Sequence, residues 1–440
     1  MRHIYKISIV LLLLPLVALQ AQNQGKQLPS DSLSLSYIIN AVMNNYPALI
    51  RADKDLEMAN AKKDLTQTAY LPDVSFSTSY TRIGPVTSIP FGGKNLQLYP
   101  PDVYSAAFSV NENIYDFGKT NKNLDLDEKN KEIVKLSSSQ IKQRLSMALL
   151  GNFYTIAFLQ EAIKIKDEQL KTLTEHLHFV EKKAATGSAT KYEIFATKVR
   201  LSSVENQKTD LLTALQIQNG QLNSYLGKPQ DTQLKVRNKL LASKLIPSTD
   251  SLCNVAFANR NEMKIARQKE EISKSKLEVI KVQNNPSLNA FASGGLKNGY
   301  FNSNMQDIAR LNFAVGVGLK VPIFDANRSK YIKVAANADL DGIKQETELA
   351  RRNITNEVVE SRANALASLK KVTQSGLQLE QAMQANALAK TSFEAGTITN
   401  LDLLDSYTIL SETEFALLKT KIDYTISLYK LKIALGEQIY

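Results

Sequence analysis

The feature that most constrains this sequence is an internal duplication, in which landmarks recur at a constant distance of 209 residues. The matched segments are Ile114-Tyr115-Asp116 and Ile323-Phe324-Asp325, Lys119 and Arg328, Gly187 and Gly396, and Leu226-Gly227 and Leu435-Gly436. Such self-similarity indicates two copies of one structural unit. Each copy is predicted to contain a shorter helix, strand, turn, strand, long helix, turn and helix. Pro72 and Pro286 open the first strand of their copies.

Most of each copy is predicted to be helical. Proline is absent from four long segments, residues 119–185, 192–226, 328–395 and 401–435. At 1.5 Å per residue the two longer helices would each reach about 100 Å, which exceeds the diameter of a compact domain. We therefore expect coiled-coil-like or bundle helices, with apolar stripes that pack helix on helix.

Four shorter segments alternate between apolar and polar residues with a period of two, which is typical of β-strands. They are residues 74–82, 104–111, 288–296 and 311–321. In the first, Val74, Phe76 and Tyr80 alternate with serines, so one face is apolar and the other carries hydroxyl groups. Each segment has about the 9–11 residues that a tilted membrane strand needs. Strands of a soluble sandwich are the alternative, although a sandwich would need more of them.

No stretch after Ala21 approaches 18 consecutive apolar residues, so any membrane crossing by the mature chain is expected to use strands. Open sheet edges cannot face lipid, because their backbone groups would lack hydrogen bonds. Four strands cannot close a barrel alone. The sequence therefore predicts that several chains assemble around one barrel.

The first 21 residues read as a secretory signal peptide, since Arg2 and Lys6 precede an apolar run that ends near Ala21. A short membrane anchor is the alternative. The 54 basic and 43 acidic residues are spread along the chain, which favours solvated helix faces over a nucleic-acid patch. The single cysteine, Cys253, cannot form an internal disulfide and is expected to be a small core residue.

The layout and several motifs resemble the TolC-like outer membrane factors. Gly396-Thr397-Ile398-Thr399-Asn400-Leu401-Asp402-Leu403-Leu404-Asp405 is similar to that family's Gly-Thr-x-Thr-x-x-Asp-Val-Leu-Asp turn, and the segment from Thr186 to Glu193 is a looser match. Residues 35–47 and Tyr70-Leu71-Pro72 also resemble the family.

The resemblance implies a mainly α fold with β: a homotrimer that forms a 12-stranded outer-membrane barrel, four strands from each chain, continued by a helical tunnel. The expected divisions are residues 1–21 (signal peptide), 22–227 (first repeat), 228–250 (equatorial linker) and 251–440 (second repeat). The resemblance also implies that the protein is an exit duct of a tripartite efflux pump or type I secretion system. The implied partners are a periplasmic adaptor protein, an inner-membrane transporter of RND, ABC or MFS type, and outer-membrane lipid.

The turns at Gly187 and Gly396 are the predicted functional sites. Glycine tolerates the left-handed conformation at a helix end, and Thr190 and Thr399 can cap the returning helices. In the family these turns contact the adaptor, so the resemblance assigns docking to Gly187, Thr190, Gly396, Thr397 and Thr399.

The resemblance places a pore constriction at Asp402, Asp405, Glu193 and Phe393. In a trimer, mutual repulsion of the two aspartates would raise their apparent pKa values. An ordinary exposed helix start is the alternative. Ile398 and Phe393 stand where better-known members carry an arginine and a tyrosine, so closure is expected to depend on helix packing and the acidic rings.

Motifs for catalysis are weak in this sequence. His176 and His178 are two apart on a helix, a poor spacing for a metal site, and both are expected at the surface. Gly118-Lys119-Thr120 lacks the first glycine of a phosphate loop, and Ser273-x-x-Lys276 has no partner motif. We expect no enzyme activity, cofactor or metal. The alternative function is a periplasmic coiled-coil adaptor without a pore.

Overall fold

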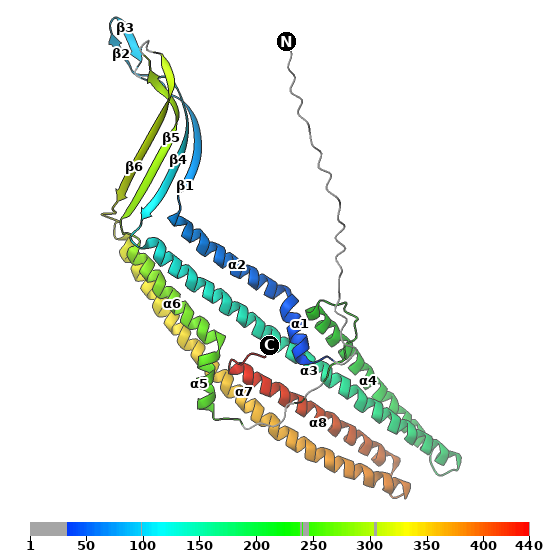
Figure 1. Ribbon diagram of the computed structural model, residues 1–440. Coiled ribbons are helices and arrows are strands. Elements are labelled where there is room, and N and C mark those ends of the chain that lie inside the picture. The colour runs from blue at the N-terminus through cyan, green and yellow to red at the C-terminus, as the bar shows by residue number, and fades with distance from the viewer. Residues whose placement is uncertain (1–32, 98, 238–239, 241–245, 303–305, 440) are drawn as a thin grey trace, which may run out of the picture.

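The computed structural model describes residues 33–97, 99–237, 240, 246–302 and 306–439. The predicted signal peptide, residues 1–21, lies outside the described residues, as do residues 238–239 and 241–245 of the expected equatorial linker. Figure 1 shows a curved sheet at one end of the molecule and long helices that extend from it. None of the helices within the described ranges is both long and apolar enough to cross a membrane.

The two copies of the duplicated unit share one order of main elements. The first contains α1 (Leu35–Asn45), α2 (Pro47–Gln67) with the short 3-10 helix η1 (Thr68–Tyr70), β1 (Asp73–Arg82), β4 (Asp102–Tyr115), α3 (Lys119–Ala185) and α4 (Lys191–Leu226). The second contains α5 (Thr249–Asn259), α6 (Asn261–Val282), β5 (Ser287–Phe301), β6 (Asp307–Lys320), α7 (Arg328–Glu394) and α8 (Asn400–Ala434). The long helices and the four strands confirm the sequence prediction to within a few residues at each end.

Each copy begins with two short helices rather than the single one expected from the sequence. The break falls at Tyr46 in the first copy and at Arg260 in the second, and both residues have extended backbone, with ψ of 127° and 132°. Pro47 explains the first break, because the residue before proline avoids helical geometry. Asn261 occupies the equivalent place in the second copy, so the break there depends on tertiary contacts.

The four long strands form one antiparallel sheet in the order β1-β4-β5-β6. Its register brings Phe76 against Phe108, with ring centroids 4.8 Å apart, on one face. On the other face the Ser75 and Ser109 hydroxyls lie 2.9 Å apart. The predicted division into an apolar face and a hydroxyl face is confirmed. Strands β1 and β6 are the sheet edges, and each has one side without a strand partner within the described chain.

A small hairpin of β2 (Ser88–Phe91) and β3 (Lys94–Gln97) is inserted between β1 and β4 and was not predicted. Its turn consists of Gly92 and Gly93, with φ of 58° and 76°. Two positive φ angles fit the type I′ turn that joins hairpin strands. The Gly-Gly pair was therefore an available signal in the sequence. The hairpin lies at the end of the sheet far from the helices (Figure 1).

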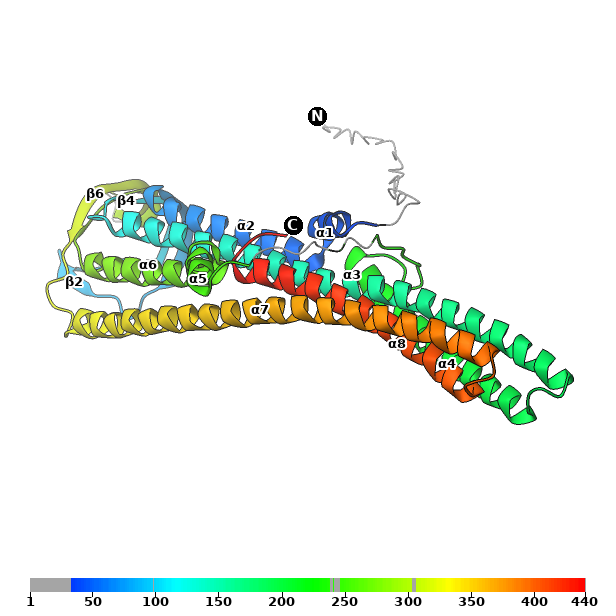
Figure 2. The same cartoon turned by 90° about the horizontal axis from the view of Figure 1, so that it is seen from below.

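The long helices form two hairpins that lie side by side. Helices α3 and α7 have 67 residues each, so they reach about 100 Å. Helix α3 returns through α4, α7 returns through α8, and α3 packs against α8. Figure 2 shows all four helices ending at the same pole of the molecule. Among the residues between α3 and α8 near their middle is Tyr154, which is buried and faces Tyr429.

Among the described residues, buried apolar side chains gather in three clusters along the helices. One joins α1, α3 and α4, the second joins α5, α7 and α8, and the third lies near the hairpin ends. Cys253 is a buried member of the second cluster, as predicted. The part of the linker that is described packs at mid-height, where the Leu33 amide donates to the Lys235 carbonyl over 2.8 Å.

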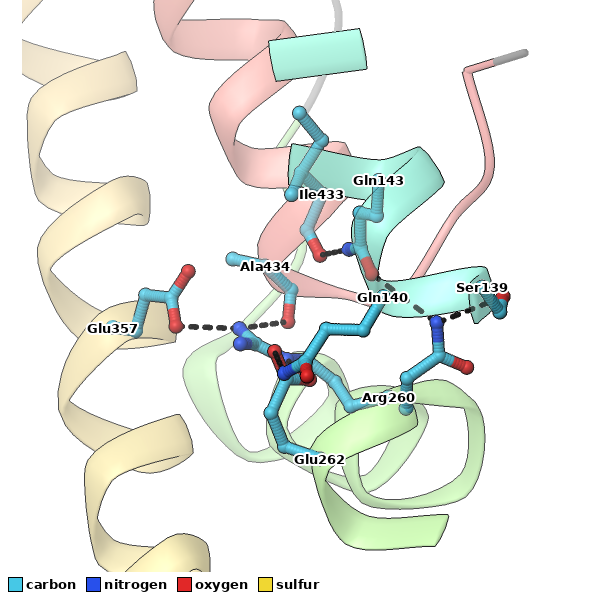
Figure 3. Close-up of polar contacts among 9 residues, drawn as sticks. Ser139, Gln140, Gln143, Arg260, Glu262, Glu357, Ile433 and Ala434 are labelled. Carbon is cyan, nitrogen blue, oxygen red and sulfur yellow. Dashed lines mark hydrogen bonds and ion pairs between the residues drawn. The ribbon is translucent and has the colours of Figure 1, made fainter. Parts of the chain in front are cut away.

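The joint between α5 and α6 is held by a polar network around Arg260 (Figure 3). Its guanidinium is almost completely buried and donates to Glu262 at 2.9 Å and to Glu357 of α7 at 2.6 Å. Burial alone would raise the pKa of Glu262, yet the hydrogen bond and charge of Arg260 hold that pKa below its ordinary value. The network therefore fastens α6 to α7 and to the end of α8.

Candidate functional site at the ends of the helical hairpins

The two hairpin turns have the same backbone geometry. Gly187 and Gly396 have φ of 78° and 75°, the left-handed conformation predicted for these helix ends. After each glycine, the next amide donates back into the helix: Ser188 to the Lys183 carbonyl at 2.8 Å, and Thr397 to the Ser392 carbonyl at 2.9 Å. These bonds satisfy carbonyls that the helix end would leave unpaired.

Each returning helix begins with a capping box. In α4 the Glu193 amide donates to the Thr190 hydroxyl at 3.3 Å, and the Thr190 amide donates to the Glu193 carboxylate at 3.0 Å. In α8 the Asp402 amide donates to the Thr399 hydroxyl at 3.2 Å, and the Thr399 amide donates to the Asp402 carboxylate at 2.9 Å. The capping roles of Thr190 and Thr399 are confirmed, and both acids take part.

Within the single chain the pKa of Asp402 is lowered, whereas mutual repulsion in a trimer was expected to raise it. Hydrogen bonds from the hydroxyl and amide of Thr399 favour the charged carboxylate and hold its pKa below the ordinary value. Asp405 lies one turn further along α8 and forms an ion pair with Arg200 of α4 at 2.7 Å. Each aspartate therefore has its own partner within the chain, and for Asp402 the bonds from Thr399 oppose the expected rise of its pKa.

Phe393 is buried, with 6% of its surface exposed. Its ring centroid lies 5.3 Å from that of His176, and the ammonium of Lys183 lies 4.8 Å from the same ring. In this conformation Phe393 contributes to the apolar cluster at the hairpin ends. Its expected place at a pore constriction stays a prediction, as do those of Asp402, Asp405 and Glu193.

The prediction that His176 lies at the surface is wrong. His176 is 6% exposed, and its Nε2 lies 2.6 Å from Oδ1 of Asn400, the first residue of α8. The amide of Asn400 in turn donates to the Glu193 carbonyl at 3.4 Å and to the Thr197 hydroxyl at 3.3 Å. Because the amide nitrogen faces these acceptors, Oδ1 accepts and His176 Nε2 carries a proton.

Burial lowers the pKa of His176, although the hydrogen bond to Asn400 and the charge of Glu193 oppose this change. The histidine is therefore neutral near pH 7 and connects α3 to α8, while Asn400 connects α8 to α4. His178, by contrast, is exposed as expected, with Nδ1 3.7 Å from Glu181. Within the described ranges, no three histidine, cysteine or acidic side chains converge as a metal site would require.

The predicted docking residues Gly187, Thr190, Gly396, Thr397 and Thr399 are exposed at the hairpin ends. Sequence reasoning missed Arg200, Asn400 and Thr197, which join the two hairpins. These residues come from helices about 200 positions apart in the chain, so no local pattern marks them. One weak signal was available in the sequence: these polar residues lie at helical spacing among apolar residues, on the face that packs against other helices.

Comparison with known proteins shows which family has this sequence and this fold. The chain matches the family described as "Outer membrane efflux protein" over residues 38–228 and 252–437. It is 21% identical over 421 residues to outer membrane protein TolC of Vibrio cholerae, covering 92% of this chain and 90% of that protein. It is also 21% identical over 420 residues to the alkaline protease secretion protein AprF of Pseudomonas aeruginosa, covering 93% and 86%.

Solved structures have the same fold. The outer membrane protein VceC of Vibrio cholerae superposes with a TM-score of 0.74 at 18% identity, covering 92% of this chain and 97% of that one. The open state of the MtrE outer membrane channel of Neisseria gonorrhoeae gives 0.73 at 15% identity, covering 92% and 89%. Since the family match spans most of the sequence, the chain belongs to the outer membrane efflux protein family.

Proposed function

We propose that this protein is an outer-membrane exit duct, which passively conducts solutes or polypeptides from a periplasm-spanning complex to the outside. The observation that carries the proposal is the sheet. Its apolar face exposes Leu311, Phe313 and Val315, which are 77–86% accessible in the single chain. Such a surface is unfavourable in water, but it suits lipid.

The assembled state is a homotrimer. The free sides of β1 and β6 need partners, because unpaired backbone groups cannot face lipid. Three four-stranded sheets, joined β6 to β1, close a twelve-stranded barrel, and three pairs of helical hairpins continue it as a tunnel. The signal peptide of residues 1–21 directs export, and residues 228–237 and 246–250 belong to an equatorial band around the helices.

The hairpin ends are the periplasmic entrance and the docking surface for an adaptor protein. Their distance from the sheet supports this assignment, since α3 and α7 carry the two turns to the end of the molecule away from the sheet (Figure 2). Among the relatives, AprF is an alkaline protease secretion protein and MtrE is an outer membrane channel. An inner-membrane transporter of RND, ABC or MFS type supplies the energy, and the duct itself performs no catalysis.

The duct is tested by reconstitution of the purified protein into planar bilayers, together with mass measurement in detergent. We expect stepwise conductance and the mass of three chains. A stable folded monomer that fractionates with soluble periplasmic proteins and never conducts would favour the adaptor alternative instead.

The entrance is tested through Asp402 and Asp405. If both line a narrow mouth, multivalent cations added on the periplasmic side should block the current, because rings of carboxylates attract cations. Replacement of both residues by alanine should relieve the block strongly, and each single change should relieve it in part. Equal block of the double variant and the parent would place these side chains on the outer surface of the helices.

A further inference from the structure

One row of side chains on the hydroxyl face of the sheet differs from all its neighbours. The register aligns Ser79 with Ser105, Ser105 with Lys297, and Lys297 with Arg310, so one residue from each strand lies in the row. The Ser79 and Ser105 hydroxyls are 2.8 Å apart. Two hydroxyl groups are thus followed by two cations across the full width of the sheet.

The two cations face each other directly, which is an unfavourable arrangement. Side chains directly opposite on antiparallel strands have Cβ atoms about 5 Å apart, and like charges there are destabilising. Both residues are exposed, and within the described ranges neither makes an ion pair. A nearby acid, Asp307, instead accepts from the Asn298 side chain and the Gly299 amide, at 2.6 and 2.7 Å.

The neighbouring rows on this face carry no charge that could pair with the two cations. The next two rows toward the helices contain no charged residue; they are Ser77, Ala107, Gly295 and Asn312, then Ser75, Ser109, Ser293 and Ala314. On the opposite face, the row next to Lys297 is Thr78, Ala106, Leu296 and Leu311. Because that face is apolar, the cations lie on the face that a closed barrel turns toward its lumen.

We propose that Lys297 and Arg310, with the hydroxyls of Ser79 and Ser105, form an anion-binding ring in the barrel lumen, which takes phosphate or carboxylate groups of exported solutes. This inference rests on the proposed duct. An anion between the two cations removes their repulsion, and arginine can hold phosphate or carboxylate through two parallel hydrogen bonds. Threefold symmetry repeats the pair around the pore, and rings of lysine and arginine favour anions.

The position of the ring along the pore gives it a distinct role. Lys297 is far along β5, near the irregularity that follows it at Lys297/Tyr300. Asp402 and Asp405 lie at the opposite pole of the molecule. A pair of cations therefore lies near the exit and a pair of aspartates near the entrance, so an anionic solute meets its favourable site near the exit.

The test uses the full-length protein in planar bilayers, with inorganic tripolyphosphate added on the side of the sheet. We expect block of the parent channel, and about a tenfold higher concentration for half block in the K297Q/R310Q double variant. Arg82→Gln is the matched control, since it removes a cation from the same end of the sheet but at a position on the opposite face, and should leave the block unchanged.

Further variants make the outcome decisive. R310K keeps the charge and should retain most of the block, whereas K297E/R310E should abolish it and shift the reversal potential in a salt gradient toward cations. Conductance with equal block in the parent and K297Q/R310Q would overturn the anion ring while the duct stands. The absence of any conductance in the parent would overturn the duct and, with it, this site.

Discussion

The joints between the short helices of the two repeats have the same backbone geometry and opposite chemistry. In the first repeat Tyr46 occupies the break and its ring lies tilted against that of Tyr225, with ring centroids 5.8 Å apart. In the second repeat Arg260 occupies the equivalent position and binds Glu262 and Glu357. Two residues after the break, where the second repeat has Glu262, the first repeat has Ala48, and 209 residues before Glu357 it has Ala148. One fold thus tolerates an apolar joint and an ionic one.

Because of this difference, the stability of the second joint should depend on charge and pH, and that of the first should not. Apolar contacts depend little on pH, whereas a buried ion pair loses its stabilising effect when one member is neutralised or removed. Because the pKa of Glu262 is lowered in the folded chain, its contribution is present above the ordinary glutamate pKa and is lost as the pH falls through the lowered value. Acid should therefore loosen the second joint before the first.

The largest expected effect is at Arg260. Arg260→Met leaves Glu262 without its partner in a partly buried place, which should cost about 3 kcal/mol of unfolding free energy. Tyr46→Leu, the matched change in the first repeat, removes an aromatic contact and should cost about 1 kcal/mol. Denaturant titration followed by circular dichroism measures both.

A triple variant separates charge from shape at this joint. R260M/E262Q/E357Q should recover much of the stability that R260M loses, because no buried charge is left unpaired. Equal losses in R260M and Y46L, with no recovery in the triple variant, would show that the two joints do not differ in the way proposed.

The next effect compares the glycines that follow α8 and α4. Gly436 has φ of 81°, and a Cβ there would lie 2.7 Å from the backbone carbon of Asn259. Gly227 has φ of 67° with open space around it. Both alanine variants should lose about 1 kcal/mol from backbone strain, and Gly436→Ala should lose about 1–3 kcal/mol more from the close contact. Melting temperatures that fall equally would contradict the tight packing at the second joint.

The third effect concerns the link between the hairpin ends. The pKa of His176 is lowered by burial, so the unfolded state binds a proton more readily than the folded state. The stability contribution is fully present above pH about 6.5 and is lost as the pH falls toward the lowered folded value. Amide protection factors at the ends of α3 and α8, which are the intrinsic exchange rate at each pH divided by the observed rate, should therefore fall in mild acid.

His176 must be tested with its charged neighbours in view, since Glu193 of α4 and Lys183 of α3 both act on it. His176→Phe should make the protection factors at the hairpin ends independent of pH between about 5 and 7, a range that brackets the ordinary histidine pKa. The variant His178→Phe, at an exposed site, is the control and should retain the parent's profile. A pH dependence that survives in H176F would assign it to another group.

The smallest effect is expected at the ion pair between Arg200 and Asp405. Both side chains are partly exposed, so Asp405→Asn should cost less than about 1 kcal/mol and the loss should shrink in high salt. At the positions that the duplication makes equivalent, the chain has Ile409 for Arg200 and Ala196 for Asp405. No symmetry-related ion pair therefore compensates for the loss of this one. The double-mutant cycle of R200Q and D405N measures the coupling, and a value above 2 kcal/mol would contradict a screened surface pair.

Much of the fold could be predicted from the sequence because its signals are local. The period of two in β1 and β6 marked strands and their two faces, and proline-free stretches marked α3 and α7 to within a residue or two. The capping roles of Thr190 and Thr399 also followed from their places three residues after Gly187 and Gly396, at the start of the returning helices. The missed hairpin was predictable in the same way, since Gly92-Gly93 is a turn signal.

The remaining features depend on contacts between distant parts of the chain. The sequence by itself determined the repeat, the periodicities and the helix caps, since backbone conformation and side-chain alternation are set within a few residues. Only the tertiary structure decided that His176 is buried against Asn400, that Arg200 meets Asp405, that Arg260 joins three helices, and that Lys297 faces Arg310. These partners are brought together by strand register and helix packing, and a polar residue on a helix or strand does not show in its own neighbourhood which distant group will satisfy it.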